Sequence, residues 1–191
     1  MKRLLVVCCV LMLVGCASSS SSNLNYYLLD SGNSGITGAI QANEPRPLLL
    51  LGEVTLTELL RQSSLLVQLE DHQMHYALQH IWAEPLEEAI PRVLLKDLRQ
   101  RSNDFNFERG STEWFGKETY RLKIQIDQFY PNAEQQVVLS GRYWLTTVEG
   151  DKTIARDFLL TDTLSQDGYG HAVVKMRRLV TLLADSLLRS M

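Results

Sequence analysis

The chain has 191 residues, and its 19 basic and 22 acidic residues give a net charge of −3. This length suits one domain with a sizeable core. The acidic balance argues against nucleic acid as a partner, because that contact needs clustered Lys and Arg. If Lys2 and Arg3 are removed with a leader, 17 basic residues remain against 22 acidic ones, a net charge of −5.

The amino terminus has the pattern of an export signal followed by a lipid-modified cysteine. An apolar run, Leu4 to Val14, follows the basic start, and at about 1.5 Å per residue it is too short for the ~30 Å membrane core. It runs into Leu13-Val14-Gly15-Cys16, which resembles the bacterial lipobox, with a small residue before the cysteine. We therefore expect a signal peptide over residues 1–15 and diacylglycerol plus an N-acyl chain on Cys16.

Three neighbouring residues bear on the fate of Cys16. Cys8 and Cys9 show that the leader tolerates cysteine, so the plainer alternative makes Cys16 part of an ordinary signal. Ala17 stands where lipoprotein sorting in enterobacteria-like cells uses Asp for retention in the inner membrane, so the outer membrane is favoured. Without the leader, Cys16 is the only cysteine, and no internal disulfide is possible.

The rest of the chain divides into a tether and one globular domain. Residues 16–23 comprise the lipidated cysteine and a serine-rich segment, which predicts a flexible tether. Residues 24–191 are expected to form a single periplasmic domain. Within it, residues 31–47 contain three glycines and two prolines and predict a loop.

The first half of the domain predicts strands and one helix. The strand segments are Tyr26–Leu29, Leu48–Leu51 continuing through Glu53-Val54-Thr55-Leu56, and a hairpin of Leu65–Glu70 with Met74–Leu78. Helical spacing relates Leu86, Ile90, Val93, Leu94 and Leu98. Pro85 suits the first helical position. Pro91 predicts either a kink or a helix that begins near it.

The second half predicts an antiparallel meander and a long helix. Tyr120–Ile126 alternates apolar and polar residues, so one face is expected to be buried. Strands over Val137–Thr147 and Thr153–Leu160 follow. A helix is expected from Asp167 or Gly168 to about Arg189. Its apolar stripe is Val173, Met176, Val180, Leu183 and Leu187, broadened by Leu179, Leu182 and Leu188. We favour deeper core over a subunit contact for the extra positions.

No catalytic or metal motif stands out. His72, His75 and His80 lack zinc-site spacing and are better explained as loop and strand-edge residues. Glu84, Glu87 and Glu88 are ordinary acidic residues at a helix start, where they complement the helix dipole. Neither a nucleophile elbow nor a phosphate-binding loop is present. We therefore expect no enzyme and no cofactor beyond the lipid on Cys16.

Aromatic side chains are the better candidates for contact with a partner, because they carry large area and are enriched at interfaces. We select Trp82, Trp144 and Tyr169 as possible interface residues, against the alternative that they are core. Tyr143 and Trp144 are adjacent in a predicted strand and face opposite ways, so at least one of them is expected outside the core.

The ordered set of motifs resembles the auxiliary lipoproteins of ABC-type transport systems, the paraquat-inducible lipoprotein family. The resemblance covers nearly the whole mature chain. Its motifs, in order, are Tyr26-Tyr27-Leu28-Leu29, Glu53-Val54-Thr55-Leu56, Leu65-Leu66-Val67-Gln68, Trp82-Ala83-Glu84-Pro85-Leu86, Leu139-Ser140-Gly141 and Gln166-Asp167-Gly168-Tyr169. The long loop over residues 31–47 and Pro91 depart from the family pattern.

The resemblance implies an α/β sandwich with a mixed sheet, similar to anticodon-binding-like and TolB amino-terminal folds. It also implies a non-catalytic outer-membrane subunit that docks on or caps an MCE-domain periplasmic bridge protein (PqiB-like) in intermembrane lipid transport. Members of the family are expected to form homo-oligomers, with a ring as one form. The alternative function is an assembly lipoprotein acting with an outer-membrane barrel protein. A lipid-anchored hydrolase is a more remote third.

Overall fold

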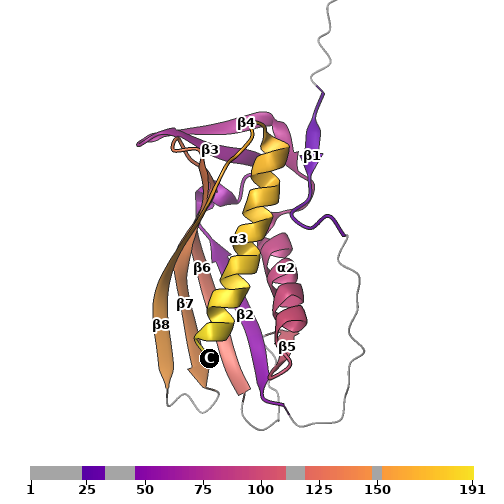
Figure 1. Ribbon diagram of the computed structural model, residues 1–191, viewed down its shortest axis with the longest axis vertical. Helices are drawn as coiled ribbons and strands as arrows, with labels where there is room; N and C mark the ends of the chain where they lie inside the picture. The colour runs from indigo at the N-terminus through magenta and orange to yellow at the C-terminus, as the bar shows by residue number, and fades with distance from the viewer. Residues whose placement is uncertain (1–22, 33–45, 111–118, 148–151) are drawn as a thin grey trace, which may run out of the picture.

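The computed structural model describes residues 23–32, 46–110, 119–147 and 152–191 (Figure 1). The expected signal peptide, Cys16 and most of the tether lie outside these ranges. The described strands form two sheets, and two long helices pack beside the larger one. The expected α/β class, with mixed sheets, a meander and flanking helices, is confirmed.

The larger sheet has five strands. Its order is β5 (Asn106–Arg109), β2 (Leu48–Leu56), β6 (Thr119–Pro131), β7 (Gln136–Thr147) and β8 (Thr153–Thr163). β2 runs parallel to both neighbours, whereas β6, β7 and β8 form the predicted antiparallel meander. The alternation predicted for β6 is confirmed, because Leu122, Ile124 and Ile126 are buried and their polar neighbours face solvent.

The smaller sheet has three strands, in the order β1 (Asn25–Tyr27), β4 (Gln73–Trp82) and β3 (Ser64–Glu70). β3 and β4 are the predicted hairpin, with Asp71 and His72 in the turn. β4 runs further than predicted and pairs in parallel with β1, so Tyr27 lies beside Trp82. In Figure 1 this sheet lies at one end of the molecule, opposite the carboxyl end of α3.

Two helices cover one face of the five-stranded sheet. α2 (Leu86–Arg101) packs on β2 and β5, α3 (Tyr169–Arg189) packs on β7 and β8, and the two helices contact each other (Figure 1). Their apolar side chains enclose the core with those of the sheet. Each Leu or Ile buried there contributes about 1.5–3 kcal/mol. The helix side of the core is formed by Ile90, Val93, Leu94, Leu98, Met176, Leu179, Val180, Leu183 and Leu187.

The broad apolar stripe of α3 serves mainly the core, as favoured. Leu179 is fully buried with the rest of the stripe, because α3 contacts both the sheet and α2. Leu182 and Leu188 are only partly buried at the rim of the core. None of the helices within the described ranges is long and apolar enough to cross a membrane.

The structure places Pro85 outside the first helix, unlike the position predicted for it, and Pro91 within that helix. Pro85 lies just before α2, not at its first position, and its carbonyl accepts hydrogen bonds from the backbone N–H groups of Glu88 and Ala89. The helix continues through Pro91 and does not begin there. Pro91 cannot donate to the carbonyl four residues earlier, a loss of about 3 kcal/mol. Burial of Pro91 and of Ile90 beside it offsets that cost.

Candidate functional site

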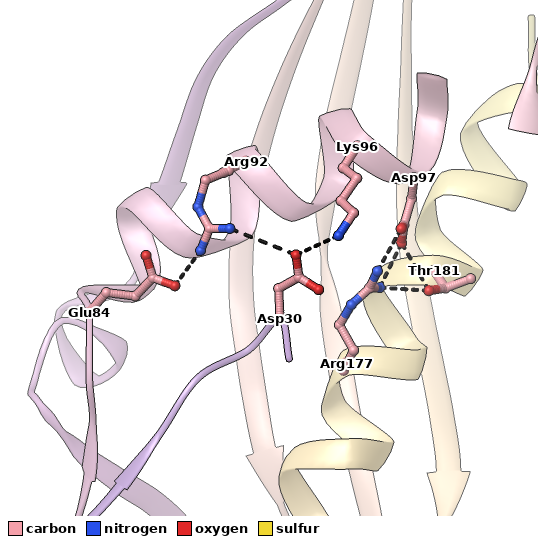
Figure 2. Close-up of polar contacts among 7 residues, drawn as sticks. All are labelled: Asp30, Glu84, Arg92, Lys96, Asp97, Arg177 and Thr181. Atoms are coloured by element: carbon pink, nitrogen blue, oxygen red, sulfur yellow. Dashed lines mark hydrogen bonds and ion pairs between the residues drawn. The ribbon is translucent and has the colours of Figure 1, made fainter. Parts of the chain in front are cut away.

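The described chain enters the domain through β1, and a polar junction fixes this entry to the first helix. Leu29 is buried directly after β1, and Asp30 follows it. The Asp30 carboxylate accepts a hydrogen bond from Lys96 Nζ at 2.8 Å and lies 3.9 Å from an Arg92 guanidinium nitrogen (Figure 2). Arg92 also pairs with Glu84, just ahead of α2. The junction therefore joins the segment that follows β1 to α2.

The charge state of Asp30 follows from these contacts. Burial raises the pKa of Asp30, but the hydrogen bond and charge of Lys96, the Gly32 backbone N–H and the Arg177 charge lower it by more. The pKa therefore lies below its ordinary value. Gly32 has a φ of 72°, a conformation that favours glycine, and this turn brings its N–H to Asp30.

The Asp30–Lys96 pair is expected to make stability depend on pH. Because the pKa of Asp30 is lowered on folding, its contribution is complete above about pH 4–5 and is lost as pH falls through the folded-state value. Lys96→Met should lower the free energy of unfolding by about 1–2 kcal/mol at pH 7, and less at pH 3. Urea unfolding across this range measures it.

The matched control is Lys123→Met. Lys123 pairs with Glu53 at 3.6 Å, and both side chains are more than half exposed. Such exposed pairs contribute about 0–1 kcal/mol, so this variant should unfold much like the wild type at every pH. A Lys96→Met effect that stays constant down to pH 3 would contradict the assignment.

A second polar cluster joins the two helices. Asp97 of α2 is the one buried charged residue in the described ranges, 3% exposed. Its two oxygens accept hydrogen bonds from Arg177 of α3 at 2.6 and 2.7 Å (Figure 2). The Thr181 hydroxyl donates to Asp97 at 2.9 Å and accepts from Arg177 at 2.7 Å. Every charge in the cluster is therefore compensated.

Sequence reasoning missed both polar clusters, although one signal was available. Asp97 falls on the apolar stripe of α2, three residues after Leu94 and beside Leu98. A charged residue at such a position is almost always paired. The partner could not be identified in the same way, since Arg177 lies 80 residues further along the chain.

The aromatic interface candidates occupy three different environments. Trp82 is 6% exposed and belongs to the core cluster, so its ring packs inside the domain. Tyr169 opens α3, half-buried, with its ring stacked on His80 at 3.8 Å between centroids. Trp144 is also half-buried, whereas its neighbour Tyr143 is core, as the alternation predicted.

Trp144 lies on the sheet face that the helices leave uncovered. It borders a shallow hollow of about 420 Å³ with Glu53, Thr55 and Lys123. A second hollow, by the β3–β4 turn, is lined by Glu70, Asp71 and other mainly polar residues. Both hollows differ from the mostly apolar, concave pockets that hold small molecules.

Several of the residues considered for chemistry have structural partners. The acidic residues at the start of α2 pair with arginines: Glu84 with Arg92, Glu87 with Arg61 and Glu88 with Arg109. His72 lies in a turn, His75 lies on β4, and His80 shares a 2.8 Å hydrogen bond with the Tyr27 hydroxyl. Within the described ranges, no three His, Cys, Asp or Glu residues gather as metal ligands.

Comparison with known proteins matches the chain to a family of transport lipoproteins and to two relatives of known name. The family described as ABC-type transport auxiliary lipoprotein component matches residues 27–187. The intermembrane transport lipoprotein PqiC of Escherichia coli K12 is 29% identical over 151 residues, covering 79% of this chain and 77% of PqiC. The protein of the same name from Shigella flexneri gives the same values.

Solved structures agree with the fold. An uncharacterised protein of known crystal structure superposes with a TM-score of 0.72 at 20% identity, covering 88% of this chain and 98% of that protein. Protein XCC0632 from Xanthomonas campestris gives a TM-score of 0.64 at 14% identity, covering 75% and 82% of the two chains. At these identities the likeness concerns the fold alone.

Proposed function

Because the chain belongs to the ABC-type transport auxiliary lipoprotein family, we propose that it is an outer-membrane lipoprotein subunit of an intermembrane lipid transport system. The proposal rests on the family match over residues 27–187, together with the sequence identity to proteins named intermembrane transport lipoprotein. The family describes an auxiliary component of transport, not an enzyme.

The membrane attachment in this proposal uses the amino terminus. Residues 1–15 are removed as a signal peptide, and lipid on Cys16 holds the domain on the periplasmic side of the outer membrane. A single acyl chain gives only marginal binding, so the diacylglycerol and N-acyl groups together provide a stable anchor. The Asp30–Lys96 junction supports this arrangement, because it fixes the segment just after β1, a few residues beyond the tether, to α2.

The proposed partner is an MCE-domain protein that bridges the periplasm, and the subunit docks on or caps that bridge as a homo-oligomer. Trp144 is the aromatic side chain that best suits a protein contact, since it lies half-buried on the open sheet face. Tyr169 is a second proposed contact. Trp82 suits this role less well, because it is a core residue in the described chain.

One experiment tests anchor and partner together. Cells expressing tagged wild-type protein, Cys16→Ser or Cys9→Ser are fed an alkyne palmitate, and their membranes are separated. The wild type and Cys9→Ser should carry palmitate and sediment with the outer membrane, since Cys9 is removed with the leader. Cys16→Ser should carry none and be missing from that fraction. Mild-detergent pull-down from the wild-type outer membrane should recover an MCE-domain protein.

The outcomes separate the competing functions. Palmitate on Cys16→Ser, or none on the wild type, would refute the anchor. Recovery of an outer-membrane barrel protein without an MCE-domain protein would favour the assembly role. Loss of an enzymatic activity through one point change would favour a hydrolase.

A further inference from the structure

β1 and the residues beside it carry an exposed apolar row. Leu24, Tyr26 and Leu28 are 49%, 64% and 53% exposed. Tyr27 and Leu29 between and after them turn inward, Leu29 being 1% exposed. This is the alternation of an extended chain with one face on the core. The outward face therefore presents two leucines and a tyrosine to whatever lies beyond it.

The row is held rigidly by the domain. β1 is paired with β4 along its length, with Tyr26 beside Ile81. The backbone N–H of Ala83 donates to the Tyr27 carbonyl at 2.8 Å, and Asp30 is held by Lys96 just beyond. Because the strand is fixed, Leu24, Tyr26 and Leu28 cannot turn inward to escape water. Clustered exposed apolar side chains of this kind mark a contact surface.

The position of the row in the sequence indicates which apolar phase contacts it. Only residues 17–23 separate Leu24 from the proposed lipid anchor at Cys16, and even fully extended they span about 25 Å. Figure 1 places β1 with the three-stranded sheet, at the end of the molecule away from the end of α3. The membrane is thus the nearest large apolar phase that the anchored chain meets.

The chemistry of the segment suits a membrane interface. No charged residue occurs between Cys16 and Leu29, so electrostatic attraction to anionic lipid plays no part in this contact. Tyrosine is enriched at membrane interfaces, where its ring is buried and its hydroxyl stays hydrated. Leucine side chains at the same depth in the membrane interface are buried away from water.

We propose that the exposed apolar row of Leu24, Tyr26 and Leu28, on and beside β1, rests in the headgroup region of the membrane that holds the anchor. The inference rests on the lipid attachment in the proposed function. Contact through a strand fixed to β4 and α2 sets the orientation of the whole domain.

The test uses the acylated protein, from which residues 1–15 with Cys8 and Cys9 have been removed, in phosphatidylcholine vesicles. Leu24→Cys, Tyr26→Cys and Leu28→Cys each provide one free thiol for an environment-sensitive maleimide dye, since Cys16 is blocked by lipid. Leu159→Cys is the matched control, because Leu159 is 68% exposed on β8 of the other sheet. Lipids with a doxyl group near the headgroup then quench dyes that reach the membrane.

The three β1 labels should lose about half of their emission or more with doxyl lipid, because interfacial groups lie within ~5–10 Å of the acyl boundary. The Leu159→Cys label should not be quenched, and 0.5 M salt, roughly the level at which surface charges are screened over a few Å, should change neither result. Equal quenching at all four positions would overturn the inference.

The failures are distinguishable. If the wild type reacts with maleimide and does not float with vesicles, the anchor is absent, and both the function and this inference fail. If the protein floats but the β1 labels are unquenched, the inference alone fails. Labels shielded from water yet unquenched by lipid would assign the row to a second copy or a partner protein, which also overturns it.

Discussion

A Gly141→Ala variant is expected to lose about 4 kcal/mol or more of unfolding free energy, near the extreme for a single substitution. A Cβ at this position would lie 2.0 Å from the Gln125 carbonyl oxygen and 3.0 Å from Phe158 Cζ. The total free energy of unfolding of a domain of this kind is only about 5–15 kcal/mol. Most of the variant should therefore fail to accumulate as folded protein.

The expected loss is large because the clash involves backbone in the middle of a sheet. Gly141 pairs with Ile126 of β6 on one side and with Phe158 of β8 on the other, directly beside a register shift in β6. The strands cannot separate without breaking hydrogen bonds on both sides of β7. Glycine is required here because there is no space for a Cβ atom, and not because of the backbone conformation.

The control for this prediction is Gly170→Ala. Gly170 lies in the first turn of α3, and a Cβ there meets nothing within 4 Å. Alanine favours helix over glycine by about 0.5–1 kcal/mol, so this variant should be neutral or slightly more stable. Urea midpoints compare the variants. Adding Phe158→Leu to Gly141→Ala should rescue little, because the carbonyl clash remains. A Gly141→Ala variant within about 1 kcal/mol of wild type would contradict the argument.

Breaking the Asp97–Arg177 pair is the second large effect, with an expected cost of about 3–5 kcal/mol for Asp97→Ala. The substitution removes two of the three acceptors of the guanidinium and one partner of Thr181, while the positive charge stays half-enclosed between the helices. Arg177→Met should cost about as much, because it leaves Asp97 charged and buried. The double variant Asp97→Leu with Arg177→Met should recover much of the loss, since neither charge remains.

The same two helices provide a matched control. Arg101 of α2 and Asp185 of α3 form an ion pair at 2.8 Å whose side chains are 40% and 29% exposed. Asp185→Ala should therefore cost about 0–1 kcal/mol. Urea unfolding of Asp97→Ala and Asp185→Ala measures the two costs side by side. Equal costs for Asp97→Ala and Asp185→Ala would refute the role assigned to burial.

Local patterns predicted most elements well, for a physical reason. The meander and both helices were predicted because period-two and period-3.6 repeats record which face of each element meets the core. The short strand β5 was missed, since only Phe107 of its residues is buried and so it has no repeat to read. The alternative that the helix begins near Pro91 was wrong, because helix propensity is weaker than the burial of a packed face.

The candidate site also has a part that the sequence could predict and a part that it could not. The predicted lipobox around Cys16 is a contiguous motif of the kind that export machinery recognises as sequence, so it can be proposed without any knowledge of the fold. The interface aromatics were less predictable, since type alone cannot separate Trp82 in the core from Trp144 on the open face. Their burial depends on which strands become neighbours.

The amino-acid sequence alone determined the expected export and lipid attachment, the family, and the buried face of each helix and strand, because these depend on residues close together in the chain. The folded chain decided that the strands form two sheets, that β1 lies beside β4, and that Asp30 meets Lys96 66 residues away. Such pairings follow from the packing of whole elements after long loops close, and no local periodicity records them. The exposed row of Leu24, Tyr26 and Leu28 became visible only once that packing showed which side of β1 the core leaves free.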